Sequence, residues 1–206
     1  ITGSREVSSS DLNKIKIKLE MMIDYLYSRI MDYRNYVTED ELLKIHTEIL
    51  EEFMRISIEG IPCLKPIKEN GINGQQLEDI IITHTNRLKD VFRFHVTKFN
   101  CNGSKSPKKS MNPDKLDMAI VKILSEMKKA FDELLYITKD LSIDQAKEVY
   151  TAGFTKIYTL HADNVPCFQV AKTMPINGKN SAELEAFHVN KFKKNLDMHI
   201  NMFGCK

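Results

Sequence analysis

Tryptophan is absent from this 206-residue sequence, and glycine and proline are scarce, at 8 and 6 residues. So few turn-forming residues favour an all-α fold over a turn-rich β-sandwich. An excess of charge of one sign is also missing, because 30 lysines and arginines offset 28 aspartates and glutamates. This balance does not indicate a nucleic-acid partner. No apolar run reaches the ~18 residues of a membrane-spanning helix, so we expect no membrane span.

Motifs for catalysis and targeting are missing as well. The sequence contains no GxSxG, P-loop, GxGxxG or HExxH pattern, so we predict that the protein is not an enzyme and holds no cofactor or metal. The polar start ITGSREVSSSD has no apolar core of a signal peptide. We interpret the chain as mature, with its signal peptide already removed.

Four cysteines are present, and their spacing is regular. Cys63 and Cys101 are 38 positions apart, and so are Cys167 and Cys205. Four cysteines allow three pairings, of which we favour one bridge within each of these two pairs. The alternative links the repeats, Cys63 to Cys167 and Cys101 to Cys205. Paired cysteines and a glycosylation sequon at Asn102 favour secretion and an oxidising compartment over a reducing cytosol.

The strongest signal is an internal duplication at a constant offset of 104 residues. Residues 61–101 align with residues 165–205 without a gap, and twelve of the 41 positions are identical. Unrelated segments of average composition would match at about two or three positions. We therefore predict one helical unit at 10–101, a basic linker at 102–113 and a second unit at 114–205.

Each unit is predicted to contain three helices, because apolar residues recur at helical spacing. The expected helices are 11–35, 39–57 and 75–98, with copies at 114–138, 143–161 and 179–202. Thr38 with Glu41, and Ser142 with Gln145, predict a capping box at the start of each second helix. A bridge from Cys63 to Cys101 would require the second and third helices to run roughly parallel, with the loop between them strapped across.

The positions retained between the copies are interpreted as scaffold. They are His84, Asn86, His95, Asn73 and Gly74 in the first copy, and His188, Asn190, His199, Asn177 and Gly178 in the second. The Asn-Gly pairs favour a turn with positive φ before the third helix. For the histidines we favour imidazoles buried against the strapped loop, with pH sensing or ligand binding as the alternatives.

Methionines on the first helices, such as Met21, Met118 and Met127, leave two interpretations open. Methionine fills irregular cores, and it is also common on adaptable binding surfaces. We favour core filling. The alternative is an apolar groove for a partner helix or for a hydrophobic small molecule.

Two cysteine pairs, Cys63 with Cys101 and Cys167 with Cys205, in a duplicated helical chain resemble the organisation of secreted arthropod salivary and effector proteins. A similar family is the bicycle family of aphid gall effectors, although no tyrosine lies between the cysteines here, unlike its Cys-Tyr-Cys pattern. The resemblance implies secretion into a host and action on host macromolecules. Our leading hypothesis is therefore a secreted, non-enzymatic interaction protein with a host protein partner. The alternative is an extracellular carrier of a hydrophobic small molecule or lipid.

Overall fold

The computed structural model describes residues 6–61, 69–71, 74–98, 106–164, 173, 175 and 178–202. These residues form an all-α fold with no strand, as predicted. The helices are α1 (Ser9–Asp32), α2 (Glu39–Glu59), α4 (Leu77–Lys98), α5 (Pro113–Thr138), α6 (Ile143–Asn164) and α7 (Ser181–Met202). Their bounds lie within three residues of the predicted ones.

Local hydrogen bonds explain where the helices begin. Thr38 forms a complete capping box, since its hydroxyl accepts from the Glu41 N–H and the Glu41 carboxylate accepts from the Thr38 N–H. Ser142 caps α6 in the same way, but the side chain of its predicted partner, Gln145, bonds elsewhere. Gln145 instead accepts from the Val7 N–H at 3.1 Å and donates to the Val7 carbonyl at 2.8 Å.

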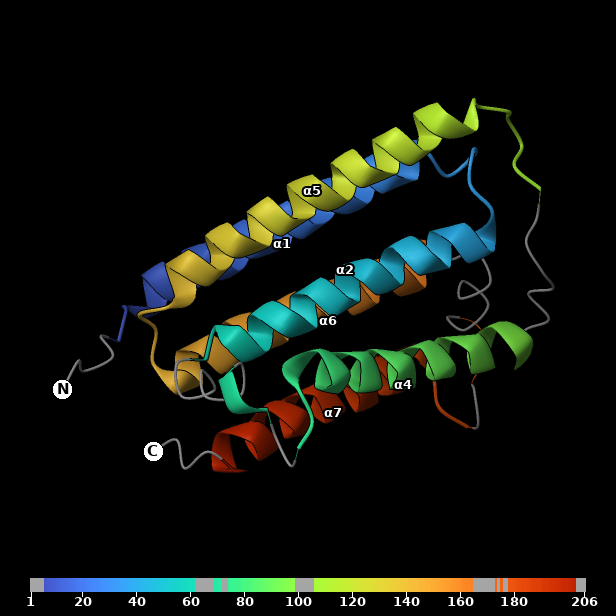
Figure 1. Ribbon diagram of the computed structural model, residues 1–206. Helices are drawn as coiled ribbons and strands as arrows, with labels where there is room; N and C mark the ends of the chain where they lie inside the picture. The colour runs from blue at the N-terminus through green and yellow to red at the C-terminus, as the bar shows by residue number, and fades with distance from the viewer. Residues whose placement is uncertain are drawn as a thin grey trace.

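The helices form three layers of two: α1 with α5, α2 with α6, and α4 with α7 (Figure 1). Under the offset of 104 residues, α1 corresponds to α5, α2 to α6 and α4 to α7. The contacts between layers follow this correspondence, because α1 packs on α6 while α5 packs on α2. The first helix of each half therefore packs on the second helix of the other half, so the halves are not independent beads.

At the surface, ion pairs join α1 to α6 and to α5, and α2 to α5. Those between the two halves include Lys16–Glu148, Lys156–Asp24, Lys18–Glu133, Arg29–Glu126 and Arg55–Asp132. Exposed pairs of this kind contribute at most about 1 kcal/mol each, so they guide the pairing of helices more than they stabilise it.

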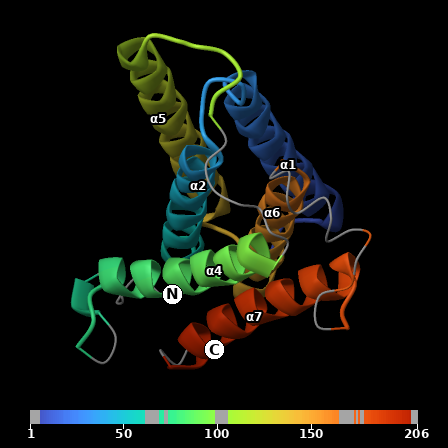
Figure 2. The same ribbon diagram turned by 90° about the vertical axis from the view of Figure 1, so that its right-hand side faces the viewer.

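Helices α4 and α7 cross the other four as a separate layer (Figure 2). In Figure 1, α4 runs from left to right, whereas α2 runs from right to left. The sequence-based prediction that the second and third helices run roughly parallel is therefore wrong. That prediction depended on an assumed bridge between residues 63 and 101, and both cysteines lie outside the described residues.

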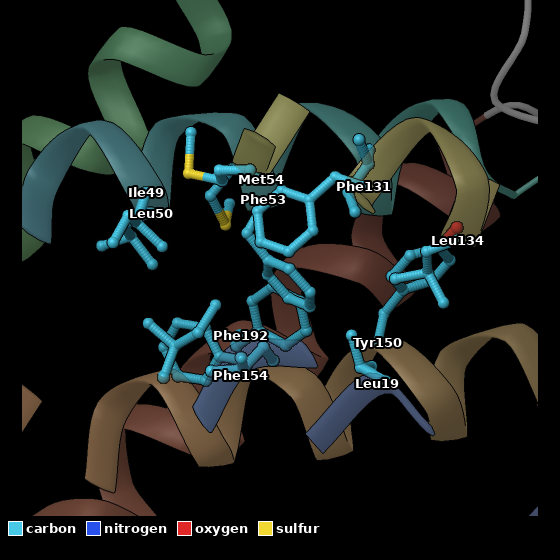
Figure 3. Close-up of a cluster of buried hydrophobic side chains, with 14 of the residues drawn as sticks. Leu19, Ile49, Leu50, Phe53, Met54, Phe131, Leu134, Tyr150, Phe154 and Phe192 are labelled. Atoms are coloured by element: carbon cyan, nitrogen blue, oxygen red, sulfur yellow. The ribbon is translucent and has the colours of Figure 1, made fainter. Parts of the chain in front are cut away.

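The core lies between α1, α2, α5 and α6, and α7 closes one side of it (Figure 3). Phe53 of α2 is fully buried at its centre and makes edge contacts with the rings of Phe131 and Tyr150, at centroid distances of 5.6 and 6.1 Å. Phe154 of α6 stacks on Phe192 of α7 at 4.4 Å. Such ring pairs add about 0.5–1.5 kcal/mol each to the gain from burial.

Candidate functional site

The outer face of α1 exposes three large apolar side chains in a row. Ile17, Met21 and Tyr25 are 56%, 67% and 57% exposed, and they follow one another at four-residue spacing. This spacing places them on one face of the helix, along about 12 Å of its axis. The buried residues of α1, including Leu19, Ile23 and Tyr27, lie on other faces. We call Ile17, Met21 and Tyr25 the α1 apolar row.

The corresponding face of α5 is different. Val121 occupies the position of Ile17 and is 66% exposed, but Ser125 and Lys129 occupy the positions of Met21 and Tyr25. Single exposed apolar residues are normal on protein surfaces, whereas a contiguous group of them marks an interaction site more often. The row is thus a property of the first half of the chain and not of the repeat.

A groove of about 700 Å³ lies beside this face, between α1, α6 and α7. Lys16 and Glu20 form its α1 side, Thr151, Thr155 and Thr159 lie along α6, and Lys193 belongs to α7. The hydroxyls of Thr155 and Thr159 donate to carbonyls one turn earlier in α6, at 2.8 and 2.9 Å.

Charges of both signs line this groove. Lys16 pairs with Glu148, and Lys147 pairs with Asp197 across to α7. Among the described residues, no group of three or more His, Cys, Asp or Glu side chains could hold a metal ion. Ala152 and Val189 also line the groove, whose wall combines apolar atoms with these charged and threonine side chains.

A second unusual feature lies inside the core. His46 of α2 and His161 of α6 are fully buried, with ring centroids 4.4 Å apart, and Tyr27 of α1 contacts His46 at 4.8 Å. Burial lowers the pKa of His46 to about 3. Burial and, secondarily, the neighbouring His46 lower the pKa of His161 as well.

The predicted site residues are distributed as follows. Cys63, Cys101, Cys167, Cys205, Asn102, Asn73 and Asn177 lie outside the described residues, as do the side chains of His84, His95 and His199. His188 is buried against Tyr158 at 5.2 Å, whereas Asn86 and Asn190 are exposed. Gly74 and Gly178 have φ of 78° and 76°, in the left-handed region.

The methionines fall into both classes that the sequence left open. Met127 is 3% exposed and belongs to the core, whereas Met21 and Met118 are among the most exposed apolar side chains. Helical periodicity around Leu19 and Ile23 places Met21 on the outer face of α1. That signal could have identified the α1 apolar row from the sequence.

Comparison with protein-family models, with curated proteins and with solved structures found no match to this chain. No helix among the described residues combines the length and apolar character needed to cross a membrane.

Proposed function

We propose that the protein is a secreted, non-enzymatic interaction protein of the effector type, and that it binds a host protein through the α1 apolar row. The observation that supports this proposal is the exposure of Ile17, Met21 and Tyr25 on one helix face. Apolar and aromatic anchors of this kind provide most of the binding energy in protein interfaces.

The surroundings of the row suit a protein partner. Lys14 and Asp24 flank it, and both side chains are largely exposed. An apolar centre with a charged rim is the usual arrangement of a specific protein interface. The helix itself is held firmly, because its opposite face is buried in the core.

The proposal also includes secretion and an internal duplication, and the sequence supports both. The even number of cysteines and the sequon at Asn102 support an oxidising compartment. The matched positions at an offset of 104 residues support a chain built from two copies of one three-helix unit. In this proposal the scaffold is common to both copies, and the binding face is specific to the first.

Affinity capture from host extract tests this proposal with three forms of the full chain. The first is the wild type, the second carries Met21→Glu and Tyr25→Glu, and the third carries Met118→Glu and Tyr136→Glu. The third is a matched control, because Met118 and Tyr136 are equally exposed on α5, at 73% and 68%. All three should show the same helical circular dichroism.

We expect wild type and control to recover the same protein, and the α1 variant to lose at least about tenfold in recovery, equivalent to ~1.4 kcal/mol. Equal recovery by all three forms would place the binding surface elsewhere. Turnover of a small molecule with no captured protein would refute the non-enzymatic proposal.

A further inference from the structure

Two imidazoles from different halves of the chain meet in the core. His46 belongs to α2 and His161 to α6, and their exposed fractions are 0% and 2%. Their rings pack edge to face, with an interplanar angle of 72° at 4.4 Å between centroids. At that separation, two positive charges would repel strongly in a medium of low dielectric constant.

The surroundings of His46 offer little to a charged ring. The ring of Tyr27 of α1 contacts the ring of His46. The Tyr27 hydroxyl and both ring nitrogens of His46 are buried without a hydrogen-bond partner among the described residues. On α7, His188 is also buried, and its ring contacts Tyr158, which lies one turn before His161 on α6. No carboxylate is among the causes of the lowered pKa of His46 or His161.

The same junction in the other half has no titratable imidazole. At an offset of 104 residues, His46 corresponds to Tyr150, His161 to Ser57 and Tyr27 to Phe131. The Tyr150 hydroxyl lies 2.7 Å from the Thr138 hydroxyl, and the Ser57 hydroxyl donates to the Met54 carbonyl at 2.9 Å. Neither a tyrosine nor a serine hydroxyl takes up a proton in mild acid, so we expect no such response at that junction.

We propose that the His46–His161 pair is a pH-sensitive switch, which keeps α1, α2 and α6 packed while both rings are neutral and releases that packing when either ring is protonated. This switch is independent of the proposed host partner. It acts at only one of the two equivalent junctions, so the packing of α1 on α6 weakens in acid before that of α5 on α2.

The direction of the pH effect follows from the protons bound in each state. An unfolded histidine has a pKa of about 6.5, and the folded pKa of both residues lies below that value. The unfolded chain therefore binds more protons between the two pKa values. The stabilisation is complete above about pH 6.5 and is lost as the pH falls toward the folded pKa.

Urea unfolding of the full chain at pH 7.5 and pH 5.0 tests this proposal. In the wild type, His46 alone should raise the unfolding equilibrium constant about thirtyfold between these pH values, and His161 should change it in the same direction. The double variant His46→Phe, His161→Gln should lack that part of the pH dependence. Tyr27→Phe is the control, because it changes the same cluster but removes no group that titrates in this range.

An equal pH dependence in the wild type and the double variant would overturn the proposal. If the double variant does not fold at pH 7.5, NMR titration of the wild-type imidazole C–H signals decides the question. The proposal predicts two of the six histidines whose signals do not move between pH 7.5 and pH 5.0 while the chain stays folded. Titration of all six near pH 6.5 would refute it.

Discussion

Gly153 lies on the buried face of α6, where a side chain would collide with the centre of the core. A Cβ atom at this position would lie 2.5 Å from Cζ of Phe53 and 2.8 Å from Cδ2 of Leu19. Both neighbours are fully buried and cannot move aside freely. A residue that would ordinarily weaken a helix is thus required here by close packing.

Gly153→Ala should lower the free energy of unfolding by about 1–3 kcal/mol, because overpacking outweighs the gain in helix propensity. The midpoint of urea unfolding measures this loss. Ser125→Ala on the exposed face of α5 is the matched control, and it should change stability by less than about 0.5 kcal/mol. A Gly153→Ala variant as stable as the wild type would contradict the packing around Phe53.

Sequence patterns predict the roles of some single residues and not of others. The helix starts at Thr38 and Ser142 follow from local chemistry, so they could be read from the chain. The side-chain amide of Gln145 bonds to the backbone of Val7 instead of closing a capping box. This contact joins residues far apart in the chain, so it could not be predicted from the sequence. The His46–His161 contact was missed because neither histidine has a counterpart at the offset of 104 residues.

At the scale of elements, helix direction bears on how the cysteines pair. In Figure 1, α2 and α7 both end at the left of the molecule, whereas α4 and α6 both end at the right. Helix α4 has 22 residues and is therefore about 33 Å long. The ends of α2 and α4, which precede the cysteines of the first pair, are thus separated by much of the molecule.

The cysteines lie outside the described residues, with Cys63 four residues after the end of α2 and the other three cysteines three residues after the ends of α4, α6 and α7. Such stretches span at most about 14 Å, and a bridge brings two Cα atoms within about 7 Å. Peptide mapping of the unreduced protein should therefore not show Cys63 linked to Cys101, because the ends of α2 and α4 lie at opposite sides of the molecule (Figure 1). Recovery of Cys63 linked to Cys101 would favour the pairing expected from the sequence and contradict the helix directions.

At the scale of the whole molecule, the duplication indicates which helices are equivalent but not which of them touch. Apolar stripes at helical spacing predicted all six helices, since each stripe needs only local periodicity. The pairing of α1 with α6 and of α5 with α2 could not be predicted. A first helix can bury its apolar stripe against the second helix of its own half or against that of the other half. Only the contacts of the complete fold decide between these two arrangements.

Each first helix packs on the second helix of the other half, so separating the halves removes this packing. Residues 1–105 and 106–206 would be produced as two chains under reducing conditions and followed by circular dichroism and sedimentation during urea unfolding. We predict that neither half unfolds cooperatively as a monomer, because α1 or α5 would lack the helix on which it packs. Mixing the halves should restore a cooperative transition in a one-to-one complex. A monomeric half that unfolds cooperatively by itself would contradict this account.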